Sequence, residues 1–395
     1  MPGLVSGAEA KGMAMAEKRK LFEDVGAGTP AAATPGLIAG RKGARRGIRV
    51  WLTMIFLLVA AMIVVGGLTR LTDSGLSITE WKPVTGSIPP LNDADWAIEF
   101  EKYKSSPEFQ LQNSQMEIAD FKSIFWWEWG HRQLGRVIGL VWFFGFLGFF
   151  LFRAIPTGWK KRLFGLGVLG GLQGAIGWWM VSSGLTGAMV DVASYRLATH
   201  LGLAFTILGL CAWYIFLLGR SETDLMQARR SGERKLVSLS TGLMHAAFLQ
   251  ILVGALVAGI DAGRGFPTWP DMNGQFFPAD AFYVPGRPLW AAFFENPGLV
   301  QFMHRMVGYV VFAFGVVVWL RGRQSAHAAT RGAFHAVMVM LVAQVALGIA
   351  TALTAAHLHV AITHQIGAVI LWVLILRARH LSMYPVAGSI REGTA

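Results

Sequence analysis

The chain has 395 residues, of which 54% are hydrophobic and only 15% are charged, well below the roughly 25% of a typical soluble domain. Its formal net charge of +12 is spread over the ends of apolar stretches, which argues against a nucleic-acid partner. The single cysteine, Cys211, lies inside an apolar stretch. An internal disulfide is therefore excluded, as are cysteine-ligated zinc and iron–sulfur sites of the usual kind.

The first 48 residues are rich in Ala, Gly, Lys and Arg. They contain neither an apolar core nor a small-residue cleavage site, so a secretory signal peptide is not expected. We predict that residues 1–48 form a disordered, basic, cytoplasmic arm.

Eight apolar stretches follow, each near the ~20 residues that a helix needs to cross a bilayer. They lie at about 50–68, 129–152, 163–183, 196–219, 236–259, 299–320, 333–354 and 358–376. We therefore predict an all-α polytopic membrane protein with eight transmembrane helices. The last two are separated by a very short turn near residues 355–357.

Lys and Arg indicate the orientation. They cluster before the first stretch, in every second connection and after the last stretch. The opposite connections include two long ones, an acidic segment at 69–126 and a Pro- and aromatic-rich segment at 260–298. The positive-inside rule then places both termini in the cytoplasm.

The two halves of the chain resemble each other. His131-Arg132 corresponds to His304-Arg305, Thr199-His200 to Thr363-His364, and Gln173 to Gln344, in the same order and at similar offsets. This predicts two duplicated four-helix bundles. The expected parts are an N-terminal half at 49–219, a cytoplasmic linker at 220–235, a C-terminal half at 236–380 and a tail at 381–395.

Four histidines are expected about one turn inside the outer ends of the even-numbered helices: His131, His200, His304 and His364. Within each half the two helices are parallel, so the two imidazoles lie at one depth and can face each other as haem ligands. Gly135 and Gly308, four residues further on, predict a bare patch for a porphyrin edge. One alternative is that these histidines only form hydrogen bonds between helices. Another is that they line a path for metal transport, but four histidines at one depth of the membrane do not form a ladder across it.

The halves differ beside these histidines. Glu128 stands three residues before His131, whereas Gln301 stands three before His304. A carboxylate at this spacing lies on the ligand's helix face, which predicts chemistry in one half and electron transfer in the other. The alternative is an interfacial ion pair between Glu128 and Arg132 or Arg136. Arg132 and Arg305 are candidates for binding haem propionates or for snorkelling to the interface.

Other polar residues have simpler explanations. Gln173 and Gln344 are expected to donate hydrogen bonds between helices. His327 and His380 are expected at the surface.

Several motifs together resemble the haem A synthase family. They are Gly67-Leu-Thr-Arg-Leu-Thr-Asp-Ser-Gly-Leu-Ser77, Glu80-Trp-Lys-Pro83, Glu128-Trp-Gly-His-Arg132, His304-Arg305 and Thr363-His364. The resemblance covers about residues 49–380. Some members carry a cysteine pair in the first outer loop; this chain has none, so it resembles the cysteine-free proteobacterial and mitochondrial branch.

The resemblance implies an oxidoreductase that converts haem O to haem A for haem-copper oxidases, by successive hydroxylation of a methyl group to a formyl group. His304 and His364 would ligate a permanent haem b, His131 and His200 would bracket the substrate haem, and Glu128 would be essential. Haem O synthase, an electron donor and a second copy of the chain are open as partners. The expected location is the bacterial inner membrane, with the mitochondrial inner membrane as the alternative.

Rival functions remain. A membrane electron-transfer cytochrome b would explain the histidine pairs but not the difference between Glu128 and Gln301. A transporter would explain the duplication but not the pairs of cofactor-like histidines. A prenyltransferase would need Asp-rich motifs for magnesium diphosphate, and none occurs at a predicted helix end.

Overall fold

The computed structural model describes residues 42–187 and 189–386. Within these residues the chain is helical, and its only β-type pairing is an isolated bridge between Met272 and Gln275. The prediction of eight helices long and apolar enough to cross a membrane is confirmed. They are α2 (Lys42–Leu71), α5 (Ile118–Leu151), α6 (Lys160–Gly184), α7 (Ser194–Leu218), α9 (Arg234–Gly259), α12 (Pro297–Gly322), α13 (Ala328–Leu353) and α14 (Leu358–Met383).

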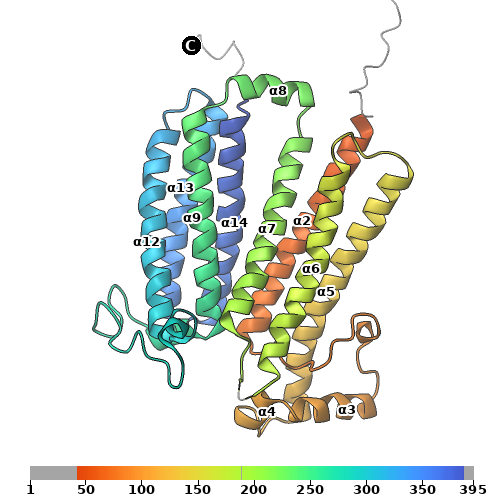
Figure 1. Cartoon of the computed structure of the whole chain (residues 1–395), viewed down its shortest axis with the longest axis vertical. Coiled ribbons are helices and arrows are strands. Elements are labelled where there is room, and N and C mark those ends of the chain that lie inside the picture. The colour runs from red at the N-terminus through yellow and green to blue at the C-terminus, as the bar shows by residue number, and fades with distance from the viewer. Residues whose placement is uncertain (1–41, 188, 387–395) are drawn as a thin grey trace, which may run out of the picture. The chain divides into compact units, whose positions relative to one another are not determined.

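The eight helices form two groups that follow chain order (Figure 1). One group consists of α2, α5, α6 and α7, and the other of α9, α12, α13 and α14. Each has its own cluster of buried apolar side chains, and the first cluster also takes in Val369, Trp372 and Leu376 of α14. The division of the chain into two duplicated four-helix halves stays a prediction.

Close packing of α7 against α9 and α14 joins the two groups. The Trp372 indole N–H donates to the carbonyl of Phe205 at 3.1 Å, and the ring lies over Gly209, where a Cβ atom would stand only 2.9 Å from the indole nitrogen. Gly202 of α7 similarly admits Leu252 of α9. Small residues let neighbouring helices approach closely where lipid supplies no hydrophobic driving force.

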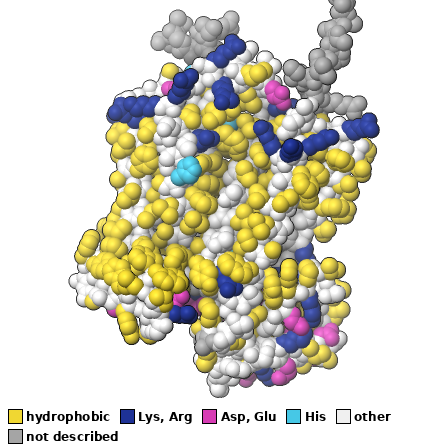
Figure 2. All heavy atoms as spheres, in the orientation of Figure 1, with side chains coloured by type: hydrophobic (Ala, Val, Ile, Leu, Met, Phe, Trp, Pro, Cys, Tyr) yellow, Lys and Arg dark blue, Asp and Glu magenta, His cyan; other side chains and the backbone are white. Residues whose placement is uncertain are grey.

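The two ends of the helix bundle differ. The first residues of α2, the end of α14 and α8 (Glu222–Arg230) lie at one end (Figure 1). The opposite end carries α3 (Asp93–Lys104), α4 (Pro107–Leu111), α10 (Ala262–Gly265), α11 (Ala292–Glu295) and the short 3₁₀ turns η1 (Thr85–Ser87) and η2 (Leu289–Ala291). Figure 2 shows Lys and Arg gathered around the end with α8, and a largely apolar band below it.

Some boundaries differ from the sequence prediction. Helix α2 begins at Lys42, so residues 42–48 are helical, and α8 and the start of α9 lie inside the predicted 220–235 linker. Helix α14 runs to Met383, into the predicted tail. Residues 1–41 and 387–395 of the predicted arm and tail lie outside the described residues. The very short turn before α14 is confirmed, because α13 ends at Leu353 and α14 starts at Leu358.

Helix α5 begins at Ile118, well before the predicted 129, so His131 lies several turns inside it. Its first turn is fixed by a capping box between Glu117 and Asp120. Phe121 and Phe125 of this extension pack with Trp96, Phe100 and Tyr103 of α3 in a separate aromatic core. This core stabilises the helix beyond its apolar stretch.

The surface prediction for His380 is wrong. Its side chain is fully buried, with its ring near Trp213, Phe216 and Tyr384. A histidine that follows Arg377 and Arg379 suggests a solvated helix end, but packing of α14 against α7 covers it.

Candidate functional site

Each of the four predicted histidines packs against a glycine of the preceding long helix. A Cβ atom on any of these glycines would stand 2.9–3.2 Å from the nearest ring atom. Only glycine lets the backbone come this close to an imidazole. The pairs are Gly66 of α2 with His131 of α5, Gly177 of α6 with His200 of α7, Gly254 of α9 with His304 of α12, and Gly348 of α13 with His364 of α14.

His304 and His364 lie close together in the second half. Their ring centres are 6.5 Å apart and their planes are nearly perpendicular, at 86°. Two metal–nitrogen bonds of roughly 2 Å each, plus about 1 Å from each nitrogen to its ring centre, give roughly 6 Å. The spacing would therefore allow both imidazoles to bind one iron, and the Nδ1 atom of His364 is buried without a partner among the described residues.

The first half is less symmetric. The ring atom of His200 that lies nearest its contact glycine is Cε1, and the same is true of His304 and His364. The edge of His131 is different, because its Nε2 is the atom nearest the Cβ position of Gly66, at 3.2 Å.

Three glutamines hold the backbones of three histidines. The side-chain N–H groups donate to histidine carbonyls: Gln173 to His200 at 3.0 Å, Gln250 to His304 at 3.0 Å and Gln344 to His364 at 3.1 Å. The predicted interhelical role of Gln173 and Gln344 is confirmed. All three amide oxygens are buried without a partner in the described part of the chain.

Gln173 and Gln250 leave the ring lone pairs free. The amide nitrogen of each is 3.1–3.3 Å from both nitrogens of its histidine. A donor this close to both nitrogens lies over the ring and not in its plane, whereas an in-plane lone pair is what a hydrogen bond or a metal requires. The imidazole nitrogens therefore remain available as ligands.

Sequence reasoning missed Gln250 and the four glycines. The signal was present, since Gln-x-x-x-Gly occurs at 173–177, 250–254 and 344–348. The expectation of a bare patch at Gly135 and Gly308 is wrong. Met62 lies 3.3 Å from the Cβ position of Gly135, and Gln250 lies 3.2 Å from that of Gly308, so each gap admits a side chain of the neighbouring helix.

Glu128 is buried and fully bonded. Its Oε2 accepts the Ser77 hydroxyl and the Ile78 N–H, both at 2.7 Å. Its Oε1 accepts two N–H groups of Arg132, at 2.6 and 3.0 Å. The ion pair weighed as the alternative is present, and the carboxylate ties the segment that follows α2 to α5.

Arg132 and Arg305 each clamp the connection that precedes their own helix. Arg132 donates to the carbonyls of Ile78 and Glu80, and Arg305 donates to those of Phe266 and Asp271. Their binding of haem propionates stays a prediction. Arg132 also lines an open groove of about 340 Å³, together with Trp129 and Arg136.

Gln301 does not reproduce the bonding of Glu128. Its amide donates only a long 3.4 Å bond to Phe266, and its oxygen is buried without a partner among the described residues. Glu128 and Gln301 therefore differ in charge and in anchoring, and the division of the halves into chemistry and electron transfer stays a prediction.

Glu108 in α4 is a second buried carboxyl at the end of the bundle opposite α8. Its side chain is 3% exposed, and one of its oxygens has no partner in the described part of the chain. Burial raises the pKa of Glu108 from 4.5 to about 8, and the charge of Glu128 adds to the effect. Burial therefore favours the protonated form of Glu108.

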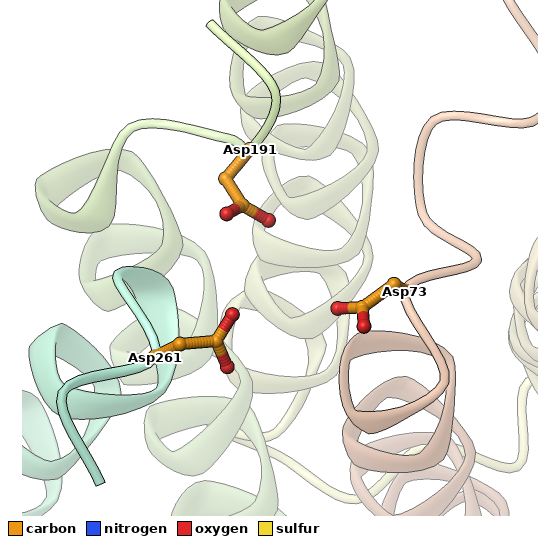
Figure 3. A group of neighbouring side chains, drawn as sticks. All are labelled: Asp73, Asp191 and Asp261. Carbon is orange, nitrogen blue, oxygen red and sulfur yellow. The ribbon is translucent and has the colours of Figure 1, made fainter. Parts of the chain in front are cut away.

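Three aspartates meet at the end of the bundle opposite α8, where the two helix groups touch. Asp73 follows α2, Asp191 precedes α7 and Asp261 follows α9; Figure 3 shows their carboxylates turned toward a common space. Arg70 pairs with all three, at 2.7, 3.2 and 2.8 Å respectively. Burial raises the pKa of Asp191, and Arg70 opposes that rise. Arg70 and Asp73 belong to the 67–77 motif, so this motif ties the halves together.

Comparison with known proteins identifies the family to which this chain is similar. Residues 49–376 match the model of the cytochrome oxidase assembly protein family. A heme A synthase of Cereibacter sphaeroides is 64% identical over 387 residues, which cover 96% of this chain and 99% of that protein. The heme A synthase of Ruegeria pomeroyi is 65% identical over 381 residues, 95% of this chain and all of the relative.

The chain belongs to the haem A synthase family. The predicted family is thereby confirmed, and the match spans both helix groups and all four histidines of the site. The family's relatives named here are bacterial, which agrees with the proteobacterial branch expected from the missing cysteine pair.

Proposed function

We propose that this chain is a haem A synthase of the bacterial inner membrane, which oxidises a methyl group of haem O to a formyl group and so supplies haem A for oxidase assembly. The observation that carries the proposal is the spacing of His304 and His364, which fits two ligands of one iron. It is supported by relatives of the same name, similar over nearly the whole chain. Proposed partners are haem O synthase and an electron donor.

The second half is proposed to hold a permanent haem b between His304 and His364. Three features fit such a group: the ring spacing, the glycines that admit the rings and the free in-plane lone pairs. Bound there, haem b would supply one-electron transfer. Gln250 and Gln344 would hold the two ligand backbones in place.

The first half is proposed to bind haem O between His131 and His200. Glu128, on the same helix as His131, would place a fixed negative charge near the edge of the substrate. Such a preorganised charge stabilises positive charge that develops during oxidation of the methyl group. Arg132 orients this carboxylate through an ion pair at 2.6 Å.

Orientation and duplication are part of the same proposal. Both termini are proposed to be cytoplasmic, supported by the Lys and Arg around the end with α8. A duplicated four-helix unit is supported by two parallel sets of contacts, His131 and His304 each with a glycine of the preceding helix. The histidines would then lie toward the periplasmic side.

The deciding experiment identifies the pigments of the purified protein from cells that make haem O. Haem B together with haem O or haem A, the latter two depleted by His131→Ala or His200→Ala, would support the proposal. Haem B at both sites, unchanged when haem O is supplied, would refute it and favour an electron-transfer cytochrome b.

A further inference from the structure

One of the four histidines lacks the glutamine that holds the others. In three helices the residue one turn before the contact glycine is Gln173, Gln250 or Gln344, and each donates to a histidine carbonyl. In α2 the residue four positions before Gly66 is Met62.

Packing shows that Met62 occupies the same place as Gln250. Met62 Cε lies 3.3 Å from the Cβ position of Gly135, and Gln250 Nε2 lies 3.2 Å from that of Gly308. Gly135 and Gly308 each stand four residues after a site histidine, His131 and His304 respectively. The two side chains are therefore equivalent in position and different in chemistry.

Methionine cannot make the glutamine's bond. Its thioether has no N–H group and accepts hydrogen bonds only weakly, and its chain has three soft torsions. The carbonyl of His131 accordingly receives no side-chain donor among the described residues, and its ring presents Nε2 to Gly66 where the other three present Cε1. His131 is the least constrained of the four.

We propose that His131 is the releasable axial ligand of the substrate haem, that His200 is its anchor, and that Met62 sets this difference. The inference rests on the proposed function. A substrate haem must enter and its product must leave, which requires one iron–imidazole bond to open; no electrons are exchanged in that step. A permanent haem is better held by two fixed ligands. In the second half, Gln250 holds the backbone of His304 and Gln344 holds that of His364.

The test measures ligand release in the full-length, haem-loaded protein. Carbon monoxide binds a reduced bis-histidine haem only after one histidine has left, so its slow binding phases report release at each site. In a second experiment, excess apomyoglobin takes up the haem that the protein releases, and mass spectrometry identifies which haem leaves first. The order of release then assigns the fast and slow carbon monoxide phases to the two haems. We expect a fast phase for the first-half haem and a slow phase for haem b.

Three variants decide between outcomes. Met62→Gln should slow the first-half phase about five- to tenfold, the change expected from one added hydrogen bond, and keep a low-spin bis-histidine spectrum. Met62→Leu, which is apolar and has no donor, should leave that phase unchanged. Gln250→Met should speed the haem b phase by a similar factor.

The outcomes separate the inference from the proposed function. The inference would be overturned if the first-half carbon monoxide phase had the same rate in wild type and Met62→Gln. It would also be overturned if Met62→Leu slowed that phase as much as Met62→Gln. Neither result would contradict haem binding. If Met62→Gln does not assemble, Gln250→Met decides alone, and an unchanged haem b phase overturns the inference. If His131→Ala and His200→Ala leave both haem phases intact, the proposed function itself fails.

Discussion

Ser77 and Glu128 are 51 residues apart in the chain, yet the Ser77 hydroxyl donates to Glu128 Oε2 at 2.7 Å in a buried contact. Because the Ile78 N–H donates to the same oxygen, the carboxylate holds the segment that follows α2 against α5. Glu128 thus has two candidate tasks, to anchor this segment and to carry charge beside the site.

Glu128→Gln separates the charge from the anchor. Glutamine has a carbonyl oxygen that can still accept from Ser77 and Ile78, but it cannot form the ion pair with Arg132. We expect haem content close to wild type and haem A formation reduced about tenfold or more, because a preorganised charge is lost. Pigment extraction from cells supplied with haem O measures both.

Ser77→Ala is the matched control, since it removes one anchoring bond and keeps the charge. It should lower haem A formation far less than Glu128→Gln. Equal losses in both variants would assign Glu128 to loop anchoring, and full activity of Glu128→Gln would remove it from the mechanism.

Gly254→Ala tests the close approach of α9 to His304. The added Cβ atom would stand 2.9 Å from Cε1 of the ring, so the imidazole must shift away from its ligand position. We expect the haem b content to fall by roughly half or more, measured by the pyridine haemochrome spectrum. Gly332→Ala, where nothing lies within 4 Å, should retain full haem content; a Gly254→Ala variant with normal haem b would contradict the close-packed geometry.

The eight helices were predictable because lipid forces each span to satisfy its own backbone and to show an apolar surface. The four histidines were predictable as polar residues that repeat within such spans. Their glycine partners were not, because contacts between helices depend on how two helices approach each other. The repeated Gln-x-x-x-Gly spacing was the available signal.

The direction in which the Glu128 side chain points could not be predicted from the sequence either. Its spacing from His131 fixes its helix face, but not its rotamer, which Ser77 and Arg132 determine. The extension of α5 depends on aromatic contacts with α3, more than ten residues away in the chain. Such long-range packing leaves no periodic pattern in either segment.

Arg70→Met tests the link between the helix groups. Arg70 is 13% exposed and pairs with Asp73, Asp191 and Asp261, so its loss leaves three neighbouring carboxylates without their main countercharge. We expect a loss of about 2 kcal/mol, below the value for a fully buried pair because the aspartates are partly solvated. Thermal unfolding in detergent measures it.

Arg264→Ala is the control for Arg70→Met. Its pairs are longer, at 3.5 and 3.8 Å, and its side chain is 45% exposed, so the change should be at most about 0.5 kcal/mol. Adding Asp261→Asn to Arg70→Met should restore part of the stability by removing one of the repelling charges. Equal stability of Arg70→Met and wild type would show that the cluster does not join the groups.

Glu108 should make stability depend on pH. Burial raises its folded-state pKa from 4.5 to about 8, so folding favours the protonated form. This contribution is fully present below about pH 4.5 and is lost as the pH rises toward about 8, because the unfolded chain releases the proton first. We expect the unfolding temperature of wild type to fall by roughly 5 °C across that window. Glu108→Gln should remove this fall and be the more stable protein at pH 8, whereas Glu101→Gln, at an exposed position on α3, should keep the wild-type slope. A Glu108→Gln protein with the same pH slope as wild type would place the responsible group elsewhere.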